Sequence, residues 1–339
     1  MAPRFSIIIV TWNALDHLRE YLPSVAATSY PDFEIIIADN ASTDGSAEWV
    51  REHIPGAKIA TFDYNYGYCG GNNRAVKYSS GDILIFLNND VRVEPDWLQP
   101  LADTFSDSSV GIAQPKMLSV KEPDMFEYAG AAGGMIDKMG YPFCKGRIFD
   151  TVERDNGQYD KSSEIFWASG AAFAVRKSLF RELGGFDEDF EFHMEEIDLC
   201  WRAHKTGLRV MSQPASVVYH LGGGSLPMGS PRKVYYNYRN SLIMLTKNLD
   251  RFLFPKILFR LILDGIAGLR SLLQGRPGET WAIIRAHFSY YSRVGKSLKK
   301  RKQLLHSAIH PTPTHLVYQK LIIVQAFLFG KKKYTDLDL

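Results

Sequence analysis

Three short apolar runs that end abruptly on polar residues constrain the fold of this 339-residue chain more than any other feature. Residues 82–90 read Asp-Ile-Leu-Ile-Phe-Leu-Asn-Asn-Asp, so an apolar run of five residues stops on two amides and a carboxylate. The runs at residues 6–10 and 34–39 end in the same manner. Runs of this length are typical of buried β-strands. We therefore predict three core strands that each carry polar side chains at the carboxyl end.

Helical patterns follow two of these runs, at residues 14–27 and 46–53. Strands that alternate with helices predict an α/β fold with a mostly parallel sheet, right-handed crossovers and flanking helices. Ligands bind such open sheets outside the carboxyl ends of the strands. The three polar ends are therefore expected to meet at one edge of the sheet.

The polar residues at these ends suit a nucleotide and a metal ion. Asp90 offers the hard oxygen that Mg²⁺ or Mn²⁺ prefers, and Asn88 and Asn89 can contact a ribose or a diphosphate oxygen. Asp39 can accept the ring N–H of uracil or thymine. A turn cap after a core strand is the simpler alternative for residues 88–90.

The segment 65–73 (NYGYCGGNN) is rich in glycine. Its three glycines would let the backbone approach a ligand closely. The spacing differs from that of the G-x-G-x-x-G dinucleotide fingerprint. A flexible structural turn is the alternative.

A second group of candidates begins near Trp167. Residues 167–175 predict a strand that is entered through small residues, and residues 180–187 predict a helix that ends at a Gly-Gly pair. A further helix is predicted from Glu195 onward. Three carboxylates within its first four residues repel one another and tend to raise at least one pKa. A solvated acidic helix start, favoured by the helix dipole, is the alternative.

Six motifs in unbroken order resemble those of the family-2 glycosyltransferases, and most closely their bacterial rhamnosyltransferase-like branch. The similarity extends over roughly residues 4–240. The motifs are SIIIVTWN (6–13), DNASTDGS (39–46), GYCGGNN (67–73), LNND (87–90), GGFDE (184–188) and EEIDLCWR (195–202). The resemblance implies a GT-A fold, a nucleotide-sugar donor, a divalent cation and inversion at the anomeric carbon.

Inverting transfer is a single in-line attack, so a carboxylate base must face the acceptor hydroxyl opposite the leaving group. A metal ion neutralises the leaving diphosphate. The family pattern Glu-Asp-x-Asp places the base at its second residue, which is Glu196 here, with Glu195 and Asp198 as alternatives.

The resemblance also implies roles for residues outside the acidic helix. His220, at the end of a short apolar strand (217–220), completes the metal site with Asp90, although a structural histidine is the alternative. Trp167 is expected in the wall that holds the sugar or acceptor. The residues expected to bind the donor nucleotide are Thr11, Asn13, Asp39, Asn65, Gly71, Asn72, Asn88 and Asn89.

The net charge of +3 conceals a division of the chain. Residues 1–230 hold 20 basic and 32 acidic residues, whereas residues 231–339 hold 20 basic and 5 acidic residues. We therefore expect an acidic catalytic domain at residues 1–230 and a basic, mainly helical C-terminal region at residues 231–339. The Gly-, Ser- and Pro-rich segment 222–231 is the expected boundary. With no signal-peptide pattern at Met1, the expected compartment is the cytoplasm.

The C-terminal region has the pattern of a membrane-surface helix. Residues 252–273 are apolar but interrupted by basic residues, which fits a helix lying in the bilayer interface and not a spanning one. Basic clusters at 296–302 and 331–333 would attract anionic lipid. The alternative is a tail packed on the catalytic domain or on a second subunit, in a homodimer. Nucleic acid is a poorer partner, because no recognised binding module accompanies the charge.

The sequence thus predicts an inverting glycosyltransferase on the inner face of the cell membrane. It would move a sugar, with rhamnose one candidate, from a dTDP-, UDP- or GDP-sugar to a saccharide or lipid-linked saccharide in cell-surface polysaccharide synthesis. A non-catalytic nucleotide-sugar-binding or scaffold protein of the same fold and a nucleotidyltransferase are the alternatives.

Overall fold

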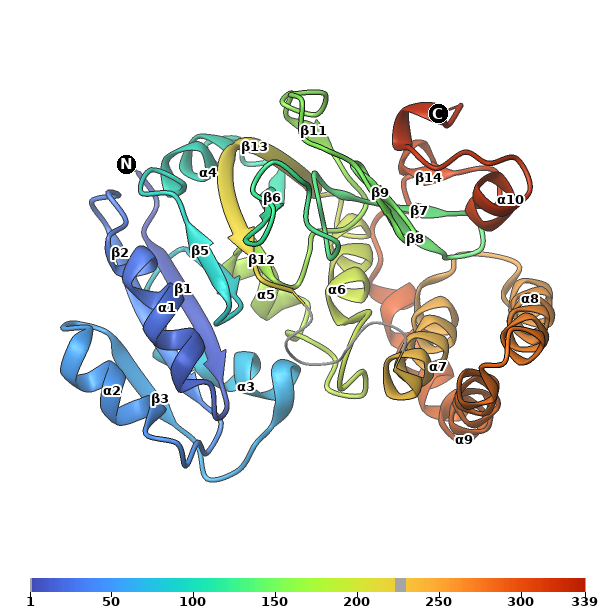
Figure 1. Ribbon diagram of the computed structural model, residues 1–339, viewed down its shortest axis with the longest axis horizontal. Coiled ribbons are helices and arrows are strands. Elements are labelled where there is room, and N and C mark those ends of the chain that lie inside the picture. Colours follow the sequence, from blue (N-terminus) through green and yellow to red (C-terminus); the bar gives the residue numbers. More distant parts are fainter. Residues whose placement is uncertain (1, 223–229, 339) are drawn as a thin grey trace.

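The computed structural model describes residues 2–222 and 230–338 (Figure 1). Its centre is a mixed sheet in the order β11-β13-β6-β12-β4-β1-β2-β3, with β5 paired to β13. The strands are β1 (Phe5–Thr11), β2 (Phe33–Asp39), β3 (Lys58–Thr61), β4 (Ile83–Leu87), β5 (Val91–Val93), β6 (Val110–Ser119), β11 (Ser163–Glu164), β12 (Ala172–Arg176) and β13 (Arg209–His220).

The three predicted core strands are confirmed as neighbours in this sheet. β1 pairs in parallel with both β2 and β4, and β2 pairs in parallel with β3. Their carboxyl ends therefore meet at one edge, as predicted. β12 departs from the parallel pattern, because it runs antiparallel to both β4 and β6.

Alternation along β1 explains why both faces of the sheet are covered. Phe5, Ile7 and Ile9 pack into one apolar cluster, whereas Ile8 packs into another on the opposite face. The first cluster includes residues of α1, α2 and α4, and the second includes residues of α3, α5 and α6. These helices are α1 (Leu15–Ala26), α2 (Ser46–His53), α3 (Gly67–Ala75), α4 (Leu98–Phe105), α5 (Lys177–Glu182) and α6 (Glu195–His204), and a 3₁₀ turn, η1 (Val76–Tyr78), follows α3.

The helices predicted at 14–27, 46–53 and from Glu195 correspond to α1, α2 and α6. The helix predicted at 180–187 is instead the earlier and shorter α5. It ends at Glu182 because Gly184 and Gly185 adopt φ values of +75° and +76°, which a helix does not accommodate.

A second, smaller sheet lies beside the first, in the order β10-β9-β8-β7-β14. Its last strand comes from the C-terminal region and pairs in parallel with β7. The strands are β7 (Gly134–Asp137), β8 (Pro142–Cys144), β9 (Arg147–Ile148), β10 (Thr151–Val152) and β14 (Val317–Tyr318). The C-terminal region thus contributes to the same sheet as the middle of the chain.

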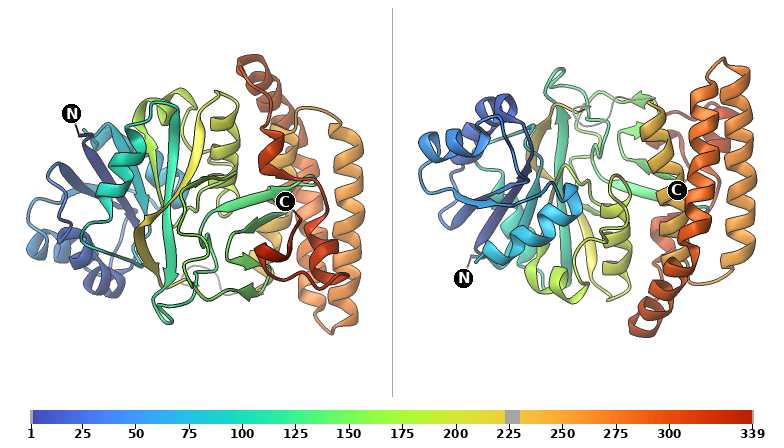
Figure 2. Two further views of the ribbon diagram at one scale, coloured as in Figure 1. Left: turned by 90° about the horizontal axis from the view of Figure 1, so that it is seen from above. Right: turned by 90° about the horizontal axis from the view of Figure 1, so that it is seen from below.

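The C-terminal region is mainly helical, as predicted, and its long helices lie side by side at one end of the molecule (Figure 2). Its elements are α7 (Pro231–Asn248), α8 (Leu253–Leu273), α9 (Pro277–Ser307), η2 (Thr314–Leu316), α10 (Ile322–Phe327) and η3 (Tyr334–Asp336). Apolar residues 242–245 of α7 belong to the same buried cluster as Ile197 of α6. The two regions that differ so strongly in charge therefore share one core.

The boundary expected at 222–231 falls mostly on residues 223–229, which lie outside the described residues. α7 begins directly after it, where the Ser230 hydroxyl accepts a hydrogen bond from the backbone N–H of Lys233. Within residues 2–222 and 230–338, every helix is too short or too polar to cross a membrane.

Candidate active site

A cavity of about 550 Å³ opens at the carboxyl end of β4, between that strand end and the first turn of α6. Asn88 and Asp90 enter it from the end of β4, and His220 enters from the end of β13. Asp90 Oδ1 lies 3.2 Å from His220 Nε2, and Asn88 Nδ2 lies 3.4 Å from the same nitrogen. The antiparallel pairing of β13 with β5, in which His220 is opposite Val91, brings together residues that are far apart in sequence. Asn89 is partly exposed at the same strand end.

Glu127 lies on the other side of the His220 ring, with its Oε1 3.3 Å from Nδ1. Its Oε2 accepts a hydrogen bond from the backbone N–H of Ala129, which fixes the carboxylate. Burial lowers the pKa of His220, but Asp90 and Glu127 outweigh this effect and raise it to about 10. The sequence analysis missed Glu127 because it follows no apolar run that ends in polar residues.

Glu195 and Glu196 line the same cavity from the first turn of α6. Burial raises the pKa of Glu196 to about 7, and burial and the charge of Glu196 raise the pKa of Glu195 well above its usual range. The Oε2 atoms of Glu195 and Glu196 are both buried, and neither has a hydrogen-bond partner within the described part of the chain. A carboxyl group in this state is suited to exchanging a proton near neutral pH.

The turn that leads into α6 is held in an unusual conformation. His193 and Met194 have φ values of +64° and +75°, which side-chain-bearing residues rarely adopt. The Asn240 amide on α7 donates to the carbonyls of Phe190, Phe192 and His193 at 2.7, 2.6 and 2.9 Å. Strained backbone persists where its surroundings fix it, and such strain clusters at functional sites. α7 is the element that fixes this turn.

Asp198 is on the same helix but does not reach the cavity, although it was an alternative for the base. It is fully buried, and its oxygens accept hydrogen bonds from Arg202 (2.8 Å), Lys247 (3.0 Å) and Asn248 (2.7 Å). Burial alone would raise the pKa of Asp198, but Lys247 and Arg202 lower it. A carboxylate committed to two cations in this way holds helices together and is a poor proton acceptor.

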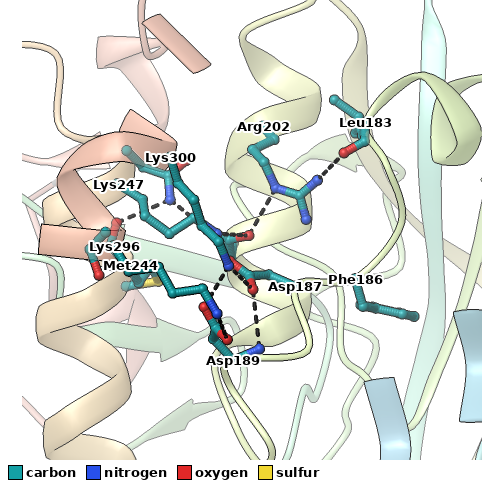
Figure 3. A network of polar contacts seen from close by, with 12 residues as sticks. Leu183, Phe186, Asp187, Asp189, Arg202, Met244, Lys247, Lys296 and Lys300 are labelled. Atoms are coloured by element: carbon teal, nitrogen blue, oxygen red, sulfur yellow. Dashed lines mark hydrogen bonds and ion pairs between the residues drawn. The ribbon is translucent and has the colours of Figure 1, made fainter. Parts of the chain in front are cut away.

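These contacts belong to a larger ion network that joins α6, α7 and α9 to the turn after α5 (Figure 3). Lys247 also contacts Asp187 at 2.5 Å, and Lys300 on α9 donates to both Asp187 and Asp189. The Arg202 guanidinium donates to the carbonyls of Leu183 (2.8 Å) and Gly185 (2.9 Å). The GGFDE motif therefore serves as the junction between the catalytic body and the C-terminal helices.

Trp167 lies in the core and not in the cavity wall, contrary to the expectation. It is 4% exposed, and its indole N–H donates to the Met135 carbonyl at 2.8 Å. Its ring fills the space beside Gly134, where an added Cβ would come within 2.1 Å of the indole. The small residues after Trp167 predicted a strand from 167, but the regular strand β12 begins only at Ala172.

The donor-binding candidates at the ends of β1 and β2 tie two loops together. The Asn13 Oδ1 accepts a hydrogen bond from the backbone N–H of Thr43 at 2.8 Å, and Asp39 Oδ1 accepts from that of Ser42 at 3.1 Å. Asp39 is buried, and Thr11 beside it has a hydroxyl with no partner in the part of the chain that the structure describes. These candidates lie together at the predicted edge of the sheet, outside the lining of the 550 Å³ cavity.

The glycine-rich segment forms helix α3 and not a loop that approaches a ligand. An added Cβ on Gly71 would lie 2.9 Å from Asn40 Nδ2 and 3.0 Å from Val10 Cγ1, so this glycine lets α3 pack against the sheet. Asn65 Oδ1 accepts a hydrogen bond from the N–H of Gly67 just before the helix. Asn72 is buried, and its Oδ1 is without a partner among the described residues. Asn72 thus remains a candidate, whereas the role of Gly71 is packing.

Several cavity-lining residues were not among the candidates from sequence. Tyr68 on α3 donates its hydroxyl to the Gly170 carbonyl at 2.6 Å, at the rim near the acidic helix. His193, Lys121 and Lys233 also line the cavity. Burial and then Lys233 lower the pKa of His193 to about 4, so this ring is neutral at pH 7. Lys233 comes from α7, which no local pattern in the sequence connects with the site.

Comparisons with known proteins show which family the chain resembles. The family model of glycosyl transferase family 2 matches residues 6–184, more than half of the chain. The O-antigen biosynthesis protein RfbC of Myxococcus xanthus is 31% identical over 225 residues, which cover 64% of this chain but 17% of that protein. The N-acetylglucosaminyl-diphospho-decaprenol L-rhamnosyltransferase of Mycobacterium tuberculosis is 28% identical over 233 residues, covering 63% of this chain and 75% of that protein.

Solved structures share the fold at low sequence identity. The Staphylococcus aureus protein TarS (residues 1–349) superposes with a TM-score of 0.54 at 17% identity, covering 90% of each chain. The Pyrobaculum calidifontis mannosyltransferase PcManGT, solved with GDP-Man and Mn²⁺, gives a TM-score of 0.52 at 16% identity and covers 90% of this chain and 86% of that one. The chain belongs to glycosyltransferase family 2, and its body has the GT-A fold.

Proposed function

We propose that the protein transfers a sugar from a nucleotide-sugar donor to a saccharide or lipid-linked saccharide, with inversion at the anomeric carbon. The observation that carries this proposal is the composition of one cavity. Its wall contains the Asp90–His220 pair, at the ends of β4 and β13, and the Glu195–Glu196 pair, on the first turn of α6. An inverting transferase needs these two functions at one site, since one group must stabilise the leaving diphosphate while another takes the acceptor proton.

Glu196 is the proposed base. Its pKa of about 7 lies near physiological pH, where a general base is most effective because it is both ionised and able to hold a proton. Asp198, the alternative from the sequence, is committed to Arg202 and Lys247. Glu195 is more deeply buried, and burial and the charge of Glu196 raise its pKa well above the usual range. This shift favours the protonated form, which suits Glu195 to donate a hydrogen bond to the acceptor.

Asp90 and His220 are the proposed ligands for Mg²⁺ or Mn²⁺. The two side chains offer a carboxylate oxygen and, once the ion displaces the proton that Asp90 and Glu127 hold on the ring, an imidazole nitrogen. This donor set suits Mn²⁺ and tolerates Mg²⁺. Within the described ranges no cluster of three or more His, Cys, Asp or Glu side chains suited to a metal ion is present, and an ion held by Asp90 and His220 would take further ligands from diphosphate oxygens and water, as is usual for these ions. When bound, the ion supplies Lewis-acid neutralisation of the leaving diphosphate. Lys121 and Lys233 add positive charge to the same wall.

The donor base and ribose are assigned to Thr11 and Asp39, at the ends of β1 and β2, and to Asn72 on α3. The relatives that are named for rhamnosyl transfer and O-antigen synthesis support a deoxyhexose donor such as dTDP-rhamnose and a role in cell-surface polysaccharide synthesis. The decaprenol-linked substrate in the name of the mycobacterial relative supports a lipid-linked acceptor, and hence work at the inner membrane surface.

A thermal-shift panel tests the function. The full chain is heated with dTDP-rhamnose, UDP-N-acetylglucosamine and GDP-mannose, each with and without Mn²⁺. A ligand that binds only the folded state raises the melting temperature, by the equivalent of about 2.7 kcal/mol at 100 times its Kd. We expect one nucleotide class to give a Mn²⁺-dependent shift that Asp90→Asn abolishes. The absence of a shift with every donor would contradict the proposal.

A further inference from the structure

Helix α8 has the reverse of the usual surface pattern. Its buried residues are Arg260, Asp264, Gly268 and Ser271, spaced one turn apart along one side. Arg260 donates to Asp264 at 2.8 Å and to the Met139 carbonyl at 3.2 Å, and Ser271 donates to Glu279 on α9 at 2.8 Å. A surface helix in water normally buries its apolar side and exposes its charges. In α8 the charged pair Arg260 and Asp264 faces the protein, whereas Arg270 is exposed.

The opposite side of α8 is a continuous apolar stripe. Leu258 is 62% exposed, Ile262 is 53% exposed and Leu273 is 80% exposed. The full stripe runs the length of the helix at spacings of three or four residues and consists of Phe254, Leu258, Ile262, Ile266, Leu269 and Leu273. Isolated apolar residues are common on protein surfaces, but a patch of this length marks an interaction site.

Two neighbouring segments extend the stripe into what we call the apolar face. On α9 the exposed residues Trp281, Ile284, Phe288 and Tyr291 follow the same spacing. At the end of α10, residues 327–329 (Phe-Leu-Phe) are exposed, and the Arg270 guanidinium of α8 lies 4.5 Å from the Phe327 ring. α8 and α9 occupy the end of the molecule farthest from β3 (Figures 1 and 2). Because α8 buries its polar side against the protein, its apolar stripe faces outward at this end of the molecule.

The charge around the apolar face selects its partner. Residues 251–333 contain sixteen Lys and Arg residues and two carboxylates, Asp264 and Glu279. Both carboxylates point inward and are paired with Arg260 and Arg276, respectively. Two copies of this face would bring together surfaces of the same sign. An anionic bilayer offers an apolar interior beneath a negative surface, and exposed aromatic residues such as Trp281 favour the zone between the two.

We propose that the apolar face of α8, α9 and α10 docks on an anionic phospholipid bilayer, with α8 lying in the plane of the membrane. This proposal deepens the proposed function, because a lipid-linked acceptor is reached at that surface. It also refines the expectation from sequence. Lys296 and Lys300 of the basic cluster are paired with Asp189 and Asp187. Arg301 donates to the carbonyls of Thr246 and Leu249, at the end of α7. Lys299 and Lys302 are therefore the exposed residues of that cluster left for lipid.

The test is co-sedimentation of the full chain with two kinds of vesicles, one of phosphatidylcholine alone and one of phosphatidylcholine with phosphatidylglycerol. We expect tight binding to the anionic vesicles and weaker binding to the neutral ones. The variant L258Q/I262Q/I266Q should bind anionic vesicles at least about 100-fold more weakly, since each aliphatic side chain buried in lipid contributes roughly tenfold or more. K299Q/K302Q should mainly reduce the preference for anionic lipid.

A matched pair of variants distinguishes loss of the apolar face from the general effect of replacing an exposed apolar side chain. Ile262→Gln and Tyr78→Gln change side chains of similar exposure, 53% on α8 and 48% on the catalytic body. Only the first should weaken vesicle binding. Circular dichroism and melting should be unchanged in both. Sedimentation without lipid should show a monomer.

Two outcomes overturn the proposal. The first is a wild-type chain that ignores both kinds of vesicle. The second is a dimer in the absence of lipid that L258Q/I262Q/I266Q splits, because the face would then bind a second copy. Donor-dependent melting shifts, measured without lipid, report on the proposed function separately. If donors still shift the melting temperature but the chain does not bind vesicles, only the docking proposal is contradicted. If the chain binds vesicles but no donor shifts the melting temperature, only the proposed donor site is contradicted.

Discussion

Glu196 and Asp198 are two residues apart on α6, and their surroundings give them opposite properties. Glu196 borders the cavity, and burial raises its pKa to about 7. Asp198 points to the other side of the helix, where Lys247 and Arg202 overcome the effect of burial and lower its pKa. Environments that push the pKa values of neighbouring carboxyl groups apart are a common way to separate catalytic from structural roles.

The pH dependence of turnover tests the assignment of Glu196. A base must be ionised, and a carboxyl group with a pKa of about 7 is protonated below that pH. We therefore expect kcat/KM to rise with pH and to level off above about 7. Glu196→Gln should lower turnover about 10²–10⁴-fold, and the residual activity should lose this pH dependence. A profile that stays flat from pH 5 to 8 in the wild type would contradict Glu196 as the base.

Asp198→Asn should act on stability instead. The change leaves Lys247 and Arg202 buried without their shared carboxylate, a loss of about 3 kcal/mol or more in the free energy of unfolding. Urea unfolding measures it, with Asp103→Asn on the exposed side of α4 as the control. Because the folded-state pKa of Asp198 is lowered, its contribution is present at neutral pH and declines as the pH falls through the carboxylate range. Wild-type stability in Asp198→Asn, with lost turnover, would make Asp198 the catalytic group.

At the scale of elements, the turn before α6 and the helix α7 act as a unit. The Asn240 amide reaches three carbonyls of that turn, and Arg239 adds a hydrogen bond to the Phe190 carbonyl at 2.9 Å. The position of Glu196 therefore depends on a helix that begins about 35 residues later in the sequence. With Glu196 as the proposed base, this dependence would give the C-terminal region a role in the chemistry.

Asn240→Ala should uncouple the two elements. The buried carbonyls would lose their donor, at a cost of about 1–3 kcal/mol in unfolding free energy, and the strained residues would relax. We expect kcat to fall more than donor affinity, because the proposed donor residues lie at the ends of β1 and β2 and on α3. Asn237→Ala, in the preceding turn of α7, is the matched control and should change neither quantity. Steady-state kinetics with a melting curve for each variant checks this, and normal kcat in Asn240→Ala would contradict the role of α7.

The sequence was sufficient to predict those strands whose apolar runs and polar ends are visible in the local pattern of residues. The apolar runs of β1, β2 and β4 and the polar residues at their ends predicted both the strands and the edge at which Asp39 and Asp90 lie. The same reasoning failed for Gly71, because the residues that require it to be small, Asn40 and Val10, are distant in sequence. The local pattern also could not predict the partners of Asp198, since Lys247 reaches Asp198 from α7.

At the scale of the whole molecule, the charge division of the sequence does not separate two independent bodies. Acidic residues of the GGFDE turn and basic residues of α7 and α9 are joined in the network of Figure 3. The membrane-helix pattern at residues 252–273 was visible in sequence. The inward direction of Arg260 and Asp264 was not, because it depends on Met139 and on α9.

A chain truncated after residue 230 should fail to fold. Truncation exposes the apolar cluster that residues 242–245 of α7 complete, and it leaves Asp187 and Asp198 buried or half-buried without Lys247. We expect insoluble protein or a chain without a cooperative melting transition. A soluble truncated chain with a sharp melt and a Mn²⁺-dependent donor shift would instead establish residues 1–230 as an independent domain.

The release of nucleoside diphosphate is the most direct test of the central claim, that this cavity catalyses metal-assisted sugar transfer. The full chain is incubated with dTDP-, UDP- and GDP-sugars and Mn²⁺, and free nucleoside diphosphate is measured for wild type, Glu196→Gln and Asp90→Asn. We predict release from one nucleotide class by the wild type, loss of that release in chelator and in Asp90→Asn, and a decrease of about 10²–10⁴-fold in Glu196→Gln. Undiminished release by both folded variants in the presence of chelator would contradict the account.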